Sequence, residues 1–337
     1  MENLNPKDIV TSIDSVTSTV WSDNAPTLTH FYTSSVQVAG NSGRFYSSVY
    51  QTGSDESNAA VQFDVAYCDE QGSGSVFYNA LVTGSSPSRT NYGQYRNLII
   101  GDEYGSFVFG DYTGSYFYAI TIDRARYKEK IMLGTMDLSI KKGANVVKLT
   151  DNSSIQTTQV FKDAGRKYEL VSGSAGTVYT GKNDNGWTTS SGSYGWVLPD
   201  VGIILLNGAA LDGSAAAGGV LLATGRNSNQ NDTGSKKLID ALNTGDVFTL
   251  NSEETLSSKY LFIRARNKDY NYTSNPSFIS GSTGEILYDS FIYNPKTYVT
   301  TVGMYNADQE LLAVAKLSRP LLKDFSKEVL LRIKLDF

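Results

Sequence analysis

The chain has 337 residues, and its 29 basic and 34 acidic side chains give a net charge of −5. This balance lacks the excess of positive charge that nucleic-acid binding requires, so we expect no DNA or RNA partner. The single histidine, His30, and the single cysteine, Cys68, exclude an intrachain disulfide and most histidine-based metal or catalytic sites.

Residues 1–26 are predicted to form an N-terminal arm. The first residues lack the basic region and apolar core of a secretory signal, so we expect the protein to be made in the cytoplasm without signal-directed export. Within the arm, Ile9, Ile13 and Val16 recur at roughly helical spacing. This spacing predicts a short helix over residues 6–17.

Residues 27–149 are predicted to form a β-rich domain. Short runs such as 107–109 and 116–122 carry aromatic and β-branched side chains, and Gly, Ser, Asn and Asp separate such runs along the chain. Long stripes with a period of 3.6 residues are rare. The pattern predicts a mainly β protein of several packed antiparallel sheet or sandwich subdomains with few short helices.

An Arg-Ala-Arg-x-Lys-acid pattern occurs twice, at 124–129 and 264–269. In extended backbone, alternate side chains share one face about 7 Å apart, where two guanidinium groups could each bind a carboxylate. One interpretation is a set of subunit-docking contacts, and the other is a solvated strand end with local ion pairs. The subunit-interface candidates from this pattern are Arg124, Arg126, Arg264 and Arg266.

Residues 150–245 are richer in Gly, Ser and Asn, which predicts a β subdomain with exposed loops that could be an insertion. Ser235 and Gly245 bracket an apolar spacing typical of a short helix. The apolar stretch 201–225 contains the turn pairs Asn-Gly and Asp-Gly. We therefore expect a pair of buried strands there and no membrane insertion.

Residues 246–337 return to dense aromatic strands. From residue 329 onward apolar and polar residues alternate to the last position, which predicts a paired final strand. Its partner could be another strand of the same chain or a strand of a neighbouring subunit. The apolar face adds further interface candidates, namely Val329, Leu331, Ile333, Leu335 and Phe337.

No catalytic, cofactor or metal site stands out, and we expect the protein not to be an enzyme. His30 and Cys68 both lie in strand-like segments without a nucleophile motif. The adjacent acids Glu253 and Glu254 point to opposite faces of a strand, so they form no catalytic pair by themselves. A glycosidase needs only two separated carboxylates, and that possibility stays open.

Aromatic and amide side chains also suit sugar binding, because aromatic faces stack on sugar rings. The alternative function is therefore a glycan-binding or adhesion module. Its candidate contacts are Trp187, Tyr194 and Trp196. A tailspike-like glycoside hydrolase is a further alternative.

Four segments carry a resemblance to a known class, namely 124–135, 262–277, 298–306 and 311–325. They resemble virion structural proteins of contractile-tailed bacteriophages, especially the cyanophage type. The resemblance implies a virion component of the tail or its baseplate, with a wedge subunit as one form. It implies other virion proteins and copies of the chain itself as partners, and it carries over no catalytic residue.

Overall fold

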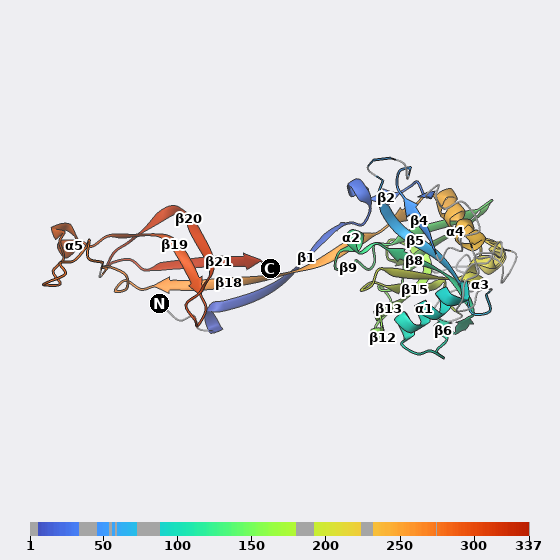
Figure 1. The fold of residues 1–337 in the computed structure, drawn as a ribbon, viewed down its shortest axis with the longest axis horizontal. Coiled ribbons are helices and arrows are strands. Elements are labelled where there is room, and N and C mark those ends of the chain that lie inside the picture. The colour runs from blue at the N-terminus through green and yellow to red at the C-terminus, as the bar shows by residue number, and fades with distance from the viewer. Residues whose placement is uncertain are drawn as a thin grey trace. The chain divides into compact units, whose positions relative to one another are not determined.

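The computed structural model describes residues 6–33, 46–53, 56–57, 59–72, 88–179, 192–223, 232–273 and 275–336. The chain divides into two compact units (Figure 1). We call residues 16–254 the central unit, and residues 1–15 together with 255–337 the terminal unit. The chain passes between the units inside two strands, β1 (Ile9–Thr19) and β18 (Asn251–Ala265).

One antiparallel sheet of 13 strands dominates the central unit. Its path runs β2-β17-β10-β11-β13-β15-β16-β8-β5-β4-β3, and β12 and β14 pair with β13. The strands are β2 (Thr27–Leu28), β3 (Tyr32–Thr33), β4 (Ser47–Tyr50), β5 (Val61–Asp69), β8 (Tyr116–Ile122), β10 (Asp137–Lys142), β11 (Asn145–Asp151), β12 (Val160–Lys162), β13 (Gly165–Ser174), β14 (Thr177–Val178), β15 (Gly195–Leu198), β16 (Ile203–Asn207) and β17 (Phe248–Thr249).

Short elements complete the central unit. A small hairpin joins β6 (Phe107–Phe109) to β7 (Tyr112–Gly114), and β9 (Lys130–Ile131) pairs with the start of β18. The helices are α1 (Ser88–Ile100), α2 (Arg124–Tyr127), α3 (Gly208–Asp212) and α4 (Asp232–Gly245), with 3-10 turns η2 (Ser22–Asn24) and η4 (Ala215–Ala217).

Aromatic residues draw the two ends of the large sheet together. Phe248 lies on β17 near one end of the strand order and Phe63 lies on β5 near the other, yet their ring centroids are 5.6 Å apart. Trp21 packs on Phe248 at 4.7 Å and donates its indole N–H to the Phe248 carbonyl oxygen at 2.6 Å. The sheet therefore curls back on itself around a buried aromatic cluster.

The outer face of the curled sheet is covered as well. Tyr92 and Ile99 of α1 are buried against Phe107, Phe117 and Trp196. The rings of Phe107 and Phe117 lie 4.5 Å apart in a tilted arrangement, a geometry that adds to simple area burial. Burial on both faces explains why strands such as β8 and β16 read as continuous apolar runs rather than as an alternation.

Replacing Trp21 with alanine should destabilise the central unit by about 3–5 kcal/mol, because it leaves a large cavity and removes a buried hydrogen bond. Chemical denaturation followed by circular dichroism would measure this loss. Tyr104→Ala is the matched control, because Tyr104 is 86% exposed and its loss should change the free energy of unfolding by less than about 0.5 kcal/mol. Equal stability of the two variants would contradict the role of Trp21 in closing the sheet.

The terminal unit is built from strands. β18 pairs antiparallel with β21 (Val329–Asp336) over eight residue pairs, from Ser258–Asp336 to Ala265–Val329. β1 lies on the other side of β18 in the same sheet. A separate hairpin consists of β19 (Thr297–Tyr305) and β20 (Leu311–Lys323), and the short elements are η1 (Pro6–Asp8) and α5 (Asp289–Tyr293).

The mainly β fold class predicted from the sequence is confirmed, and so are the helix ending at Gly245 and the paired final strand. That helix begins at Asp232, however, so Ser235 lies inside it rather than at its start. The helix predicted over residues 6–17 is wrong, because β1 occupies that segment. Its Ile, Val and Thr residues favour strands, and the backbone groups on one of its sides pair with β18.

The stretch 201–225 contains one buried strand, β16, followed by α3, rather than the predicted pair of strands. The Asn-Gly pair does not make a hairpin turn, because Asn207 caps α3 by accepting a hydrogen bond from the Ala209 backbone N–H at 3.2 Å. Among the described residues, no helix combines the length and apolar character needed to cross a membrane.

The predicted boundary near residue 149 falls inside β11, in the middle of the large sheet. Residues 27–149 and 150–245 thus lie together in the central unit. The arm and the C-terminal segment instead share the terminal unit, since β1 and β21 flank β18. Strand pairing between distant parts of the chain, rather than local composition, sets these divisions.

Candidate functional site: the apolar surface of the terminal unit

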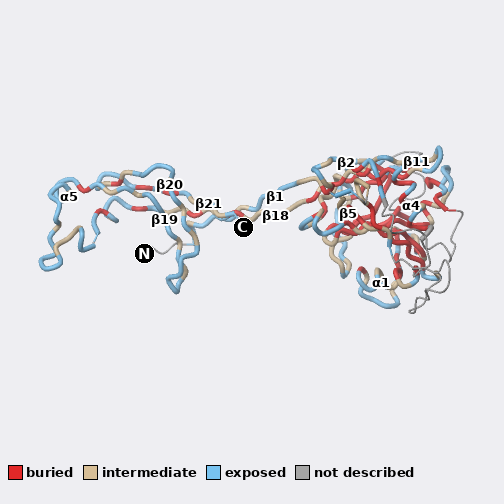
Figure 2. The backbone as a smooth tube through the Cα atoms, turned by 45° about the horizontal axis from the view of Figure 1, so that its top comes forward, coloured by how far each residue is buried: buried red, intermediate tan, exposed pale blue. Residues whose placement is uncertain are grey.

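The terminal unit has a very small core. Ala265, Val329 and Leu331 form its one cluster of buried apolar residues among the described part of the chain, and each is 8–9% exposed. Figure 2 shows the same contrast: buried segments concentrate in the central unit, whereas exposed and half-buried segments dominate the terminal unit. The unit therefore buries little apolar area by its own folding.

Large apolar side chains are instead exposed on this unit. It contains less than a third of the chain, but 17 of the 29 exposed large apolar side chains in the described ranges belong to it. Tyr293 is 87% exposed, Ile13 72% and Leu330 67%. Single exposed apolar residues are normal on soluble proteins, whereas an accumulation of this density marks a binding surface.

The β19–β20 hairpin has one face packed on the small core and one face open. Val299, Val302 and Leu317 pack against the core cluster. On the opposite face, Gly303 pairs with Val314 and Tyr305 pairs with Leu311. We call the exposed residues Tyr305, Leu311, Leu312 and Val314 the hairpin patch, and their side chains are 45–62% exposed.

A second group of exposed apolar residues lies in the segment between β18 and β19. The Phe278 ring packs edge-on against Phe291 at 4.8 Å and contacts Tyr288 at 6.1 Å. Around this pair, Leu287, Tyr288, Ile292 and Tyr293 remain 53–87% exposed. We call residues 275–294 the tip segment. Its aromatic residues pack against one another, but several of them remain exposed to solvent.

A buried lysine holds residues 267–271, which connect β18 to the tip segment, against the hairpin. The Lys323 ammonium group on β20 is fully buried, donating to the Asn271 side-chain oxygen at 2.7 Å and to the Asn267 carbonyl oxygen at 3.2 Å. Thr297 on β19 donates its hydroxyl to the Tyr270 carbonyl oxygen at 3.1 Å. These contacts position the segment that follows β18 against the base of the hairpin.

The apolar face of the final strand has a different role from the predicted one. Val329 and Leu331 belong to the unit's own core, and Ile333 and Leu335 are half-buried, so none of the four is fully presented to a partner. Leu330, on the opposite face, is the exposed apolar residue of this strand. Phe337 lies outside the described residues.

The two Arg-Ala-Arg segments do not form equivalent ladders. Arg124 and Arg126 lie in the short helix α2, capped by Asp123, so the extended geometry predicted for them is wrong. Arg264 lies on β18 and its guanidinium Nε donates to Glu328 at 3.0 Å, whereas Arg266 follows the end of the strand. This exposed ion pair adds little stability.

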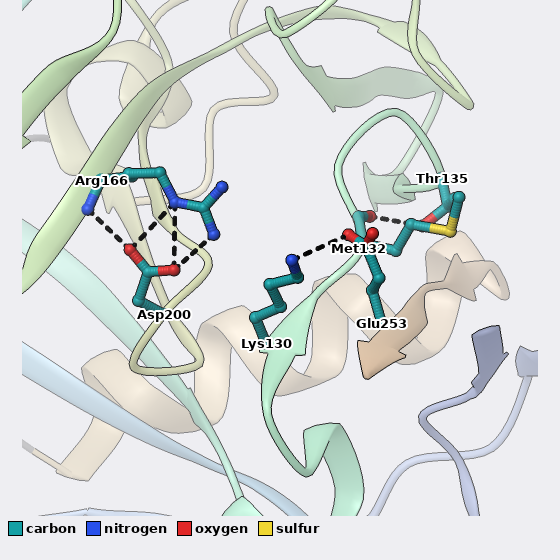
Figure 3. Close-up of polar contacts among 6 residues, drawn as sticks. All are labelled: Lys130, Met132, Thr135, Arg166, Asp200 and Glu253. Carbon is teal, nitrogen blue, oxygen red and sulfur yellow. Dashed lines mark hydrogen bonds and ion pairs between the residues drawn. The ribbon is translucent and has the colours of Figure 1, made fainter. Parts of the chain in front are cut away.

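The adjacent acids Glu253 and Glu254 each form an ion pair with a lysine of the central unit. The Lys130 Nζ and a Glu253 carboxylate oxygen form an ion pair at 3.6 Å, and Glu254 forms an ion pair with Lys128. Figure 3 shows the Lys130–Glu253 contact beside the Arg166–Asp200 pair, in which the Arg166 backbone N–H and guanidinium both donate to the carboxylate. Both glutamates are therefore engaged as charged partners of lysines.

Burial acts to raise the pKa of Asp200, but hydrogen bonds from Arg166 outweigh it and leave that pKa below its ordinary value. A carboxylate with a lowered folded-state pKa stabilises the fold above its unfolded-state pKa of about 3.9, and this contribution is lost as pH falls through the folded-state value. Asp200→Asn should therefore be less stable than the wild type at neutral pH, and the difference should shrink towards pH 2.

Urea unfolding at a series of pH values would measure this dependence. The exposed Asp111→Asn variant is the control, with no comparable change expected. A constant stability difference between Asp200→Asn and the wild type at every pH would contradict the assigned contact.

The candidate glycan contacts are not available at the surface. Tyr194 and Trp196 are 0% and 1% exposed, so neither ring can stack on a sugar, because all four residues of β15 are buried and Tyr194 lies directly before that strand. Trp187 lies outside the described residues. A different set of polar and aromatic residues does line an open pocket of about 460 Å³, including Tyr46, Asp64 and Tyr95.

Other chemistry-bearing residues are placed without a catalytic arrangement. His30 is exposed, and its Nδ1 lies 2.8 Å from the Thr29 hydroxyl. Cys68 is fully buried on β5, and burial raises the pKa of its thiol. Within the described ranges, no three His, Cys, Asp or Glu side chains gather closely enough to hold a metal ion.

Comparison of the chain with protein-family models, with curated proteins and with solved structures gave no match. The terminal unit's surface therefore has to be interpreted from its own geometry. The sequence had pointed to the final strand and to the arginines, but it did not point to the tip segment or the hairpin patch. The exposed residues of these two regions are of the same types as the residues of buried strands. Only the packing in the folded structure distinguishes the exposed residues from the buried ones.

Proposed function

We propose that the protein is an assembly subunit, which acts by burying the apolar surface of its terminal unit against other protein chains. The observation that carries this proposal is the contrast within that unit between a three-residue buried cluster and 17 exposed large apolar side chains. Interfaces of permanent complexes resemble a domain core cut in half, with aromatic side chains enriched.

The energetic argument is direct. Burying an apolar side chain contributes roughly 1.5–3 kcal/mol, so covering even four of these residues would supply several kcal/mol towards association. Tyr288 and Tyr293 of the tip segment are typical of the anchors that dominate binding energy, since they offer large contact area with few rotatable bonds. The protein itself acts as the binding element, and the proposal assigns no reaction to it.

We propose further that this assembly is the virion of a tailed phage, and within the virion its tail or baseplate. The support for this step is the resemblance of segments such as 262–277 and 311–325 to virion structural proteins. Both segments lie in the terminal unit. Other virion structural proteins and further copies of the chain are the proposed partners.

Incorporation into particles tests the proposal. Tyr293→Ser and Leu330→Lys should each lower the amount of protein incorporated at least about tenfold, because each removes an exposed apolar contact without touching a core. The matched controls in the central unit are Tyr104→Ser and Phe161→Lys, at 86% and 63% exposure, and they should be incorporated normally. Quantitative mass spectrometry of purified particles supplies the measurement.

Thermal unfolding of each free variant would establish that folding is unchanged. The assembly proposal is wrong if all four variants enter particles like the wild type and particles made without the protein assemble and infect normally.

The pocket of the central unit supports a second candidate function, glycan binding. Tyr46 is 53% exposed at its rim, and Asp64, Asn91 and Tyr95 add polar groups of the kind that bind sugar hydroxyls. Burial is the main cause that raises the pKa of Asp64, with a hydrogen bond from Ser48 opposing it and Asp123 adding to it.

A glycan array would test this candidate, with binding by the wild type that is lost in Tyr46→Ala and Asp64→Asn but kept in Tyr104→Ala. Because an acid with a raised folded-state pKa costs stability as pH rises above about 3.9, Asp64→Asn should remain folded at neutral pH. Absence of wild-type binding to any host-surface glycan would remove this candidate.

A further inference from the structure

The open face of the β19–β20 hairpin changes in chemical character along its length. At the turn, Asp308 and Glu310 are exposed acids. The hairpin patch follows with Tyr305, Leu311, Leu312 and Val314. Beyond it, Lys316 is exposed and pairs with Thr301, and register alternation places it on the same face as Val314. The order along the face is therefore acidic, apolar and basic.

The acidic and basic zones lie at opposite ends of the hairpin patch. A strand rises about 3.4 Å per residue, so Glu310, directly before β20, and Lys316 lie on the order of 20 Å apart. Leu312 lies near the middle of that interval, where the register of the hairpin shifts between Met304 and Tyr305. A bulge of this kind leaves an extra residue out of the ladder and changes the direction of its side chain.

The patch is also ordered before any partner binds. Gly303 has no side chain, and the Tyr305 ring lies across that position: a Cβ built on Gly303 would be 3.0 Å from the ring and 3.4 Å from Leu311. The ring therefore lies against the strands rather than standing free in solvent. A surface that is already ordered loses less conformational entropy on association.

We propose that the hairpin patch binds the hairpin patch of a second copy of this chain, with the two hairpins antiparallel about a two-fold axis near Leu312. This inference rests on the proposed assembly function and names one partner for that surface. In this arrangement the acidic turn of each copy faces Lys316 of the other, while the apolar residues meet in the middle. A two-fold contact requires such a self-complementary surface.

The distribution of charge favours a second copy of the chain as the partner and favours the antiparallel arrangement of the two hairpins. The terminal unit has 12 basic and 11 acidic side chains in its sequence, so the unit that carries the patch is nearly neutral although the whole chain has a net charge of −5. Parallel packing would instead place Asp308 against Asp308 and Lys316 against Lys316, and close like charges oppose association. The antiparallel arrangement pairs opposite charges at both ends of the contact.

The size of the patch sets the strength of this contact. Four half-exposed side chains bury on the order of 100 Å² each, so the two patches together bury roughly 800 Å², which is less than stable interfaces bury and is typical of a weak contact. We therefore expect a dimer that dissociates at micromolar concentration when the contact acts alone. Additional contacts within an assembly would strengthen it through effective concentration.

Cross-linking of the full-length protein tests the arrangement. Leu312→Cys places a thiol near the two-fold axis, and mild oxidation should convert most of the protein to a covalent dimer at concentrations of tens of micromolar. The native Cys68 is fully buried and does not interfere. Phe161→Cys, at a 63% exposed site of the central unit, is the matched control and should give at least about tenfold less dimer at the same concentration.

A charge swap provides a second, independent test by analytical ultracentrifugation. Asp308→Lys and Lys316→Glu should each weaken dimerisation about three- to tenfold, and the double variant should restore it, because each change is compensated by the other copy. Val314→Asp should weaken dimerisation at least about 100-fold. Folding of every variant is checked by circular dichroism.

The inference is overturned if Leu312→Cys cross-links no better than Phe161→Cys, or if the double charge variant fails to recover dimerisation. A wild-type chain that stays monomeric at 100 µM but still enters particles would also reject the homotypic contact, while leaving the assembly function in place. Failure to enter particles at all would reject the assembly function instead.

Discussion

The constraint on which this interpretation depends is the apolar surface that the terminal unit leaves uncovered. Its strands are amphipathic, but the unit contains only enough facing layers to bury one side of the hairpin and part of β21. The net stability of a folded protein is only about 5–15 kcal/mol, so a unit with so little buried apolar area gains substantially from a partner that covers the rest. Association and stability of this unit are thereby linked.

The central unit, in contrast, covers most of its apolar strand faces with its own residues. Its sheet is long enough to curl, and Trp21, Phe63 and Phe248 fill the region where its ends approach. Helix α4 adds Leu238 and Leu242 to the inner cluster, and α1 covers the outer face with Tyr92 and Ile99. A mainly β chain thus yields one unit with a large core and one with a very small core.

Particular segments illustrate the limits of sequence reasoning. The residues of β1 have apolar spacing that fits a helix, but β-branched side chains and pairing with the distant β18 decide for a strand. Arg124 and Arg126 share a local pattern with Arg264, yet Asp123 caps a helical turn at the first site only. Tyr194 and Trp196 look like surface aromatics in a Gly- and Ser-rich segment, but Tyr194 is buried in the inner cluster and Trp196 is buried in the outer cluster that α1 covers.

The sequence by itself determined the β class, the helix ending at Gly245 and the alternation of the final strand, because these follow from local periodicity and capping. Only the tertiary structure decided which apolar residues are inside: Val329 and Leu331 are covered by the hairpin, whereas Leu330 and the hairpin patch are not. The reason is physical. Burial depends on what packs against a strand face, and that neighbour is contributed by residues far away in the chain.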